Sequence, residues 1–242
     1  MWPFVRFGAM FLVAPIFSAR SIPVRIRIIL AFSLAILVQP KVGAVPVAEF
    51  LGGGWVLLMV QQVLIGVLMG VILQVAFSAV VIAGQTIATS MGLGFASAVD
   101  PQNGVQVTVV AQFYTIIATL LLLALNGHLA LIEILALSFE MVPLSTAAYS
   151  VEGLWQVVLW SGQMFVGGVL VSLPVVVGVL MVNLAFGIVT RAAPQLNIFA
   201  VGFPVTLLVG FVLMLIGVSA LEPVLPALFE NSFAFMRSSL LP

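Results

Sequence analysis

The sequence contains no cysteine and only one histidine among its 242 residues. The absence of cysteine excludes disulfide bonds, iron–sulfur clusters and thiolate metal sites. Charged residues make up only 6% of the chain, whereas roughly a quarter of a soluble domain is charged. The seven basic residues are spread along the chain and form no basic patch, which argues against nucleic-acid binding.

The sequence also lacks the short motifs that carry chemistry. It has no P-loop, dinucleotide-binding glycine motif, nucleophile elbow or zinc-protease helix motif. An active site needs titratable groups gathered in a cleft, and the chain has seven acids and His128 to supply them. We therefore expect no enzyme activity, no cofactor and no metal site, and we interpret His128 as a hydrogen-bonded turn residue.

Hydrophobic residues are in large excess, at 64% of the chain. With so few polar side chains, the protein is expected to be integral to a membrane or buried in a hydrophobic assembly. Its length suits about six spanning segments, since each needs about 20 apolar residues. The predicted fold class is therefore all-α, built from long kinked helical hairpins.

The apolar segments differ greatly in length. Predicted helices cover residues 2–17, 28–38, 55–83, 105–125, 153–190 and 198–221, and a moderately polar tail follows. The first two are short for a bilayer, whereas 153–190 would reach roughly 57 Å as one helix, against a hydrocarbon core of about 30 Å. Pro174 and the Gly167-Gly168 pair are expected to bend this long segment. The mismatch favours packing against further hydrophobic subunits over a simple six-span bundle.

Polar residues and a small-residue motif fall within residues 55–83. Gln61, Gln62 and Gln74 are costly against lipid unless paired, so we expect them to face other helices. Gly66 and Gly70 match the GxxxG motif of closely packed helices. The chain holds 21 glycines, so a chance match is easily found and the motif carries little weight.

Charged residues predict the orientation of the chain. Three arginines gather in the connection 20–27, which places that connection in the cytoplasm. The stretch 128–143 carries Glu133 and Glu140 seven residues apart, hence on one face of an amphipathic interfacial helix. A proton relay through these two acids is the alternative interpretation, because acids within a membrane are often functional.

The most unusual stretch, residues 85–104, lies between two uncharged apolar runs. It reads QTIATSMGLGFASAVDPQNG, with three glycines and an Asp100-Pro101 step. A continuous helix is disfavoured because glycine lowers helix stability and the residue before proline avoids the α region. Irregular backbone at membrane depth is tolerated where protein or a water-filled cavity covers it, so we expect this loop to face something other than lipid.

Four blocks of the sequence, in order, resemble the FliR family of flagellar export-gate proteins, whose injectisome counterparts are the SctT proteins. The blocks are APIFSARSIPVRIRI (14–28), MGLGFASAVDPQNGVQV (91–107), ALNGHLALIEILALSFEMVPL (124–144) and NLAFGIVTRAAPQLNIFAVGFPVTLLVG (183–210). The resemblance covers nearly the whole chain, and the residues of these blocks are closer to those of the flagellar members. One departure is that family members usually carry further residues ahead of the position matching Trp2.

The resemblance implies a core subunit of the flagellar type III export gate, in the bacterial inner membrane within the flagellar basal body. Such a subunit joins FliP and FliQ in a closed helical assembly, with FlhB and FlhA near its cytoplasmic entrance, and the assembly passes unfolded flagellar proteins. The further implied partners are membrane lipids. A FliP-like part is implied at residues 1–160, a FliQ-like hairpin at 161–222 and a C-terminal tail at 223–242. Because much of that complex stands above the bilayer, its helices need not match a membrane in length.

The resemblance also implies roles for individual residues. The matching loop projects into the pore and helps to plug it, as a hydrophobic constriction that excludes water and ions. Its members here would be Met91, Gly92, Leu93, Gly94, Phe95, Asp100 and Pro101. Subunit-contact or turn residues would be Arg191, Gln195, Asn197, Glu133 and Glu140. Two alternatives stay open: the loop is a buried turn between helices, or the chain is a stand-alone ion-coupled secondary transporter.

Overall fold

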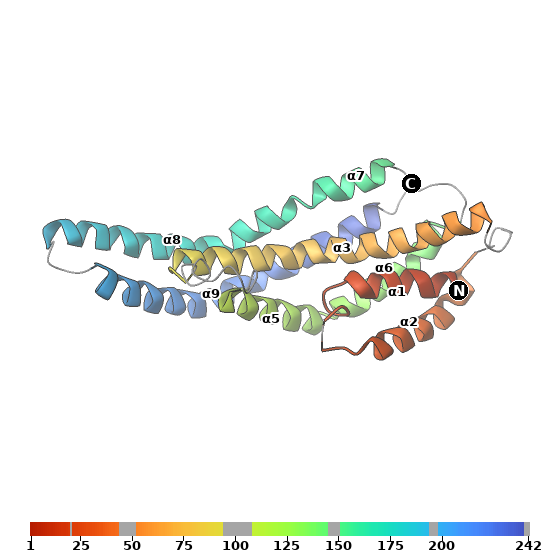
Figure 1. The fold of residues 1–242 in the computed structure, drawn as a ribbon, viewed down its shortest axis with the longest axis horizontal. Coiled ribbons are helices and arrows are strands. Elements are labelled where there is room, and N and C mark those ends of the chain that lie inside the picture. The colour runs from red at the N-terminus through yellow and green to blue at the C-terminus, as the bar shows by residue number, and fades with distance from the viewer. Residues whose placement is uncertain (20, 44–51, 94–107, 145–150, 194–197, 240–242) are drawn as a thin grey trace. The chain divides into compact units, whose positions relative to one another are not determined.

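The computed structural model describes residues 1–19, 21–43, 52–93, 108–144, 151–193 and 198–239 (Figure 1). Within these ranges the regular structure is entirely helical, which confirms the predicted all-α class. The elements are α1 (Trp2–Val13), α2 (Val24–Val38), the short 3₁₀ helix η1 (Gln39–Lys41), α3 (Gly53–Ser90), α5 (Val109–Ala124), α6 (Gly127–Met141), α7 (Val151–Trp160), α8 (Gln163–Ala192) and α9 (Ile198–Ser239).

Three stretches in the described part of the chain are long and apolar enough to cross a membrane. They lie in α3, in the joined helices α7 and α8, and in α9, and the pair α5 and α6 makes a fourth if its 65° bend is counted within one span. The prediction of about six spans is wrong for these residues, because α1 and α2 have only 12 and 15 residues. The expected mixture of short and overlong helices is confirmed.

The chain divides into two compact units, each built from separate stretches of sequence. Unit 1 comprises Met1–Ala76, Leu122–Gly162 and Phe229–Pro242, and unit 2 comprises Phe77–Leu121 and Gln163–Leu228. The long helices α3 and α9 therefore each contribute to both units.

In unit 1, α1 packs against α3 at the two glycines of the GxxxG motif. A Cβ atom on Gly66 would lie 2.3 Å from the backbone oxygen of Arg6, and one on Gly70 would lie 2.8 Å from Cβ of Val13. Real Cβ contacts are longer than this, so only glycine permits the approach. The low weight given to the motif was therefore wrong.

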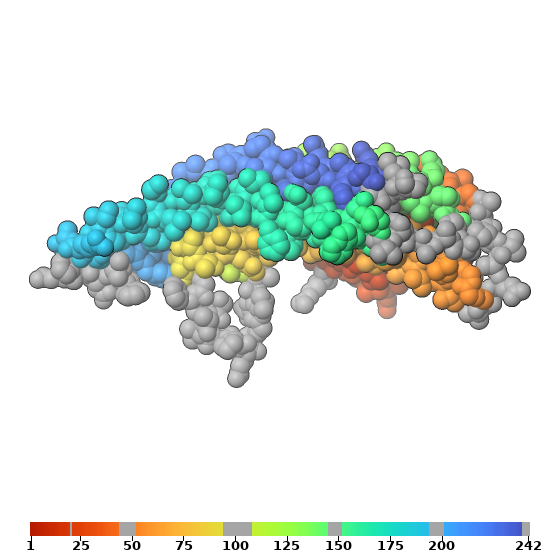
Figure 2. All heavy atoms as spheres, turned by 90° about the horizontal axis from the view of Figure 1, so that it is seen from above, coloured from red at the N-terminus to blue at the C-terminus, as the bar shows by residue number. Residues whose placement is uncertain are grey.

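In unit 2, glycines again mark the places where helices touch. A Cβ atom on Gly84 would lie 2.3 Å from Cα of Ala111, and one on Gly168 would lie 2.7 Å from Cγ2 of Ile82. The second contact places α8 beside the last part of α3, as Figure 1 and Figure 2 both show. Because packing against α5 stabilises the helix at Gly84, α3 runs on to Ser90 instead of stopping near residue 83 as predicted.

The long segment predicted at residues 153–190 is interrupted at a different place from the one expected. The two-residue turn Ser161-Gly162 separates α7 from α8, while the Gly167-Gly168 pair and Pro174 both lie within α8. The glycine pair serves close packing, with Gly168 against Ile82 and Gly167 against Leu228. The prediction of a bend at the glycine pair and Pro174 is therefore not supported.

The sequence after Glu222 continues as a helix up to Ser239, so the predicted end of the last helix at residue 221 is wrong. Pro223 and Pro226 lie inside α9 and do not end it. The reason is a buried stripe, with Leu225, Phe229 and Met236 at 0–2% exposure. Residues spaced by four and seven lie on one helix face, and their burial outweighs the local cost of proline.

Candidate functional site

The end of α3, at the root of the glycine-rich loop, is the best-defined candidate site in unit 2. The N–H of Leu93 donates to the carbonyl oxygen of Ala88 at 2.9 Å, and the N–H of Gly92 donates to that of Thr89 at 3.0 Å. Gly92 has φ of +85°, the left-handed region that favours glycine. This pair of bonds is the Schellman motif, which ends a helix and turns the chain away from its axis. The predicted helix break is confirmed, with Gly92 as its cause.

Met91, immediately before this turn, is fully buried in unit 2 against α9. An ideal Cβ atom on Gly210 would lie 2.6 Å from both Cγ and Cε of Met91 and 2.8 Å from its sulfur. Phe203 of the same helix covers the turn itself, with its Cε2 atom 3.0 Å from where a Cβ of Gly92 would lie. Two residues of α9 therefore contact two consecutive residues at the end of α3.

The predicted gate residues are only partly within the described ranges. Met91 is buried, while Gly92 and Leu93 are partly exposed. Gly94, Phe95, Asp100 and Pro101 lie outside the described residues, so their predicted role as a plug stays a prediction. Met91 makes its contact within its own chain, which fits the alternative of a packed turn at this one residue.

A second polar site, in unit 1, surrounds the fully buried guanidinium group of Arg6 on α1. Its Nε donates to Oε1 of Gln62 at 2.8 Å, its Nη1 donates to Oγ of Ser138 at 2.8 Å, and its Nη2 donates to the carbonyl oxygen of Val142 at 3.3 Å. The Cζ atom also lies 3.9 Å from the centre of the Phe139 ring. A buried charge is tolerated when such bonds and an aromatic face replace its hydration. The cluster ties α1 to α3 and α6.

Sequence reasoning missed this cluster, although its parts were visible. The expectation that the glutamines of α3 face other helices is confirmed for Gln62, which is buried and bonded to Arg6. It is wrong for Gln74, which is exposed. An arginine inside one apolar run and a glutamine inside another are each costly alone. Nothing in the sequence, however, shows that residues 56 positions apart meet.

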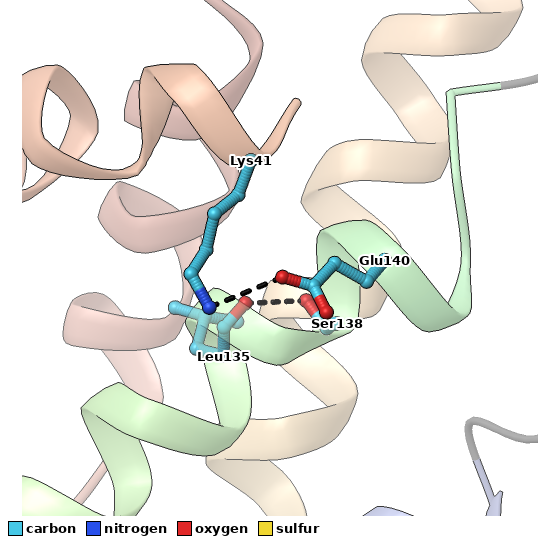
Figure 3. Close-up of polar contacts among 4 residues, drawn as sticks. All are labelled: Lys41, Leu135, Ser138 and Glu140. Atoms are coloured by element: carbon cyan, nitrogen blue, oxygen red, sulfur yellow. Dashed lines mark hydrogen bonds and ion pairs between the residues drawn. The ribbon is translucent and has the colours of Figure 1, made fainter. Parts of the chain in front are cut away.

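The two acids predicted on one face of the 128–143 helix are both exposed on α6. Figure 3 shows Glu140 paired with Lys41 of η1, with Oε1 3.1 Å from Nζ and both side chains about half exposed. Next to this pair, Oγ of Ser138 donates to the carbonyl oxygen of Leu135 at 2.6 Å. An exposed ion pair contributes little stability, so Glu140 is a surface residue in this chain.

The remaining predicted contact residues, and His128, form no site in the described part of the chain. Arg191 is exposed in the last turn of α8, while Gln195 and Asn197 lie outside the described residues. His128 lies in α6 with Nδ1 buried and without a hydrogen-bond partner in the described part of the chain, so the interpretation as a bonded turn residue is not supported at that atom. In the ranges that the structure covers, no three His, Asp or Glu residues are grouped to hold a metal ion.

Comparison with known proteins adds the family context. The sequence model of the family described as bacterial export proteins, family 1, matches residues 1–232. Two similar proteins are each named flagellar biosynthetic protein FliR. The one from Pectobacterium carotovorum is 40% identical over 96% of this chain and 87% of its own, and the one from Bacillus subtilis is 32% identical over 98% and 92%. The homologue of the same name from Escherichia coli K12 is 38% identical over 96% and 87%.

Proposed function

The chain belongs to the family of bacterial export proteins, family 1, and from this premise we propose that it is a core subunit of the flagellar protein-export gate. The proposal covers a structural role in a multi-subunit complex, without catalysis. The inner membrane, within the flagellar basal body, is the proposed location.

The observation that carries the proposal is the large apolar surface left uncovered on α8 and α9 in unit 2. In the most apolar window of α3, 61% of residues are buried, whereas the corresponding windows of the α7–α8 stretch and of α9 have 33% and 22% buried. Large side chains more than half exposed on α8 include Val169, Met181, Leu184 and Ile188. Apolar surface of this extent marks contact with other proteins or with lipid.

The length of these helices favours protein over lipid as the main covering. Helix α9 has 42 residues, or roughly 63 Å at 1.5 Å per residue, which is about twice a hydrocarbon core. Lipid therefore covers only part of the exposed surface, and the rest requires hydrophobic subunits. FliP and FliQ are the proposed neighbours along these helices. FlhB and FlhA are proposed at the cytoplasmic entrance, and unfolded flagellar proteins are the proposed cargo.

Within the gate, the residues that follow α3 are proposed to close the channel. The described support is the turn at Gly92, which ends a long apolar helix abruptly and redirects the chain. A channel narrowed by apolar side chains such as that of Phe95 excludes water and ions without any titratable gate. A role of the 161–222 region as a FliQ-like hairpin is part of the same proposal. Arg191 is proposed as a subunit-contact residue of that hairpin.

Co-purification tests the function against its rival, a stand-alone ion-coupled transporter. The chain carries an affinity tag and is expressed with the FliP and FliQ proteins of the same bacterium. A gate subunit is expected to elute with both in one complex, in fixed ratio, after size exclusion. A carrier would elute alone, remain stable alone and bind a small solute, and that result would reject the proposal.

A further inference from the structure

We propose that Gly210 is a positioning residue that anchors the end of α3 to α9, and with it the start of the gate loop. The packing part of this inference stands on the described contacts alone. Its consequence for ion tightness rests on the proposed function, in which the residues after Gly92 close the channel.

The anchor is the contact between the buried side chain of Met91 and Gly210 of α9. Three atoms of Met91 lie within 2.8 Å of the position that a Cβ on Gly210 would take. Real Cβ atoms essentially never approach so closely, so an alanine at position 210 requires Met91 to change its side-chain conformation. Sδ and Cε are the flexible end of that side chain, whereas Cγ moves only if the χ1 angle rotates. The Met91 side chain is fully buried there. The fit is therefore specific to the pairing of a long flexible side chain with a residue that has none.

A second contact makes the anchor resist rotation as well as displacement. Phe203 lies seven residues before Gly210 on α9, about two helical turns away on the same face. It covers Gly92, whose left-handed backbone turns the chain out of α3. Two contacts along one face of α9 therefore lie against Met91 and Gly92, the two consecutive residues at which α3 turns.

The closeness of this contact distinguishes Gly210 from another glycine of the same helix. Gly217 has only ordinary contact, since its Cβ position lies 3.6 Å from Cγ2 of Val175. An alanine at position 217 fits and favours the helix, whereas an alanine at position 210 displaces Met91. The inference therefore predicts opposite behaviour for two chemically identical substitutions.

A disulfide test examines the contact itself in the assembled gate, independently of channel closure. The chain has no cysteine, so Met91→Cys with Gly210→Cys introduces the only two thiols of this subunit. The Cβ position of residue 210 lies 2.6 Å from Cγ of Met91, which is one bond from the Met91 Cβ, so the two Cβ atoms are close enough for a disulfide. Mild oxidation is expected to join them in nearly every copy, and export of flagellar proteins is expected to continue in the oxidised cells. If the disulfide does not form, or if oxidation stops export and a reductant restores it, the inference that Met91 stays packed against Gly210 is refuted.

An ion-conductance test then examines the consequence, per assembled complex in membranes. Gly210→Ala is expected to raise passive conductance about tenfold, because overpacking of about 1.4 kcal/mol raises the ratio of open to closed complexes by that factor. Gly217→Ala is the matched control and is expected to stay tight. Met91→Ala added to Gly210→Ala removes the clash and is expected to restore part of the seal, which a general loss of folding would not permit.

Phe95→Ser separates failure of the anchor from failure of the proposed function. If Phe95→Ser leaks while Gly210→Ala and Gly217→Ala remain equally tight, the anchor is refuted and the proposed closure stands. If Phe95→Ser also remains tight, the closure itself is refuted, and the disulfide test alone decides whether Gly210 holds Met91.

Discussion

Helices α1 and α8 are both apolar, yet they differ in what covers them. In unit 1, α1 buries Phe7, Met10 and even the charged Arg6 completely within its own chain. In unit 2, α8 leaves Met181 and Leu184 more than 60% exposed. Since the two sequences are about equally hydrophobic, the difference lies in the available partners. Most apolar side chains of α1 are buried by this chain itself, whereas those of α8 have to be covered by lipid or by other subunits.

The largest effect is expected from a substitution in the buried helix of this comparison, α1. Arg6→Ala removes three hydrogen bonds and a ring contact, and it deprives the buried acceptors on Gln62 and Ser138 of their arginine donor. We expect a loss of about 3 kcal/mol in stability. Thermal denaturation of the purified gate in detergent measures it. Arg25→Ala, at an exposed position of α2, is the control and should change little.

A somewhat smaller effect is expected at the glycine contact between α1 and α3. Gly66→Ala places a methyl group against the backbone of Arg6 and should cost about 1–3 kcal/mol. Gly8→Ala, on α1 with open space around it, should instead stabilise the helix by up to about 1 kcal/mol. The same assay compares them. Equal shifts in both variants would show that α1 does not pack on Gly66.

The exposed helix of the comparison, α8, is tested by a substitution that should leave the subunit folded. Leu184→Gln lies on the exposed face of α8, at 63% exposure, so the stability of the subunit should barely change. The yield of the proposed complex with FliP and FliQ should fall about tenfold if that face is buried between subunits. Quantitative co-purification at equal membrane abundance measures this. An unchanged yield would identify the face as lipid-exposed.

The smallest effect is expected at the Lys41–Glu140 ion pair. Each side chain is about half exposed, so Glu140→Gln should cost about 0.5 kcal/mol or less after screening by solvent. The loss should vanish at high salt, because mobile ions already weaken the pair. Denaturation midpoints at two salt concentrations check this. A larger loss that persists in salt would mean that Glu140 has a further role in the assembly.

Sequence reasoning succeeded where a local rule acts alone. The helix break was predicted from glycines and is located at Gly92, whose positive φ requires a residue without a side chain. It failed where packing overrides local preference. The predicted helix ended at residue 83, but Ala111 packs against Gly84 and α3 continues to Ser90. Pro223 and Pro226 were expected to lie in a polar tail, but burial of Phe229 and Met236 keeps α9 helical.

The candidate sites show the same limit. The predicted gate residues came from a motif that resembles a known family, and Met91 and Gly92 lie at the end of α3, where that loop begins. Met91 and Gly92 contact Gly210 and Phe203 of α9, which lie more than 100 positions further along the sequence. These contacts depend on how α9 packs beside α3. The partners of Arg6 are equally distant, with Ser138 132 positions away. Contacts at such separations have no signature in a single sequence.

Composition and local chemistry were sufficient to establish an all-helical, membrane-type chain with a break near Gly92, because hydrophobicity and backbone freedom are properties of individual residues. The family, too, could be read from short ordered blocks. The choice of which glycines are contact points, where helices truly end, and how a buried arginine is neutralised came only from the folded chain. These depend on atoms that approach within a few ångströms after folding, and such distances are properties of pairs of residues.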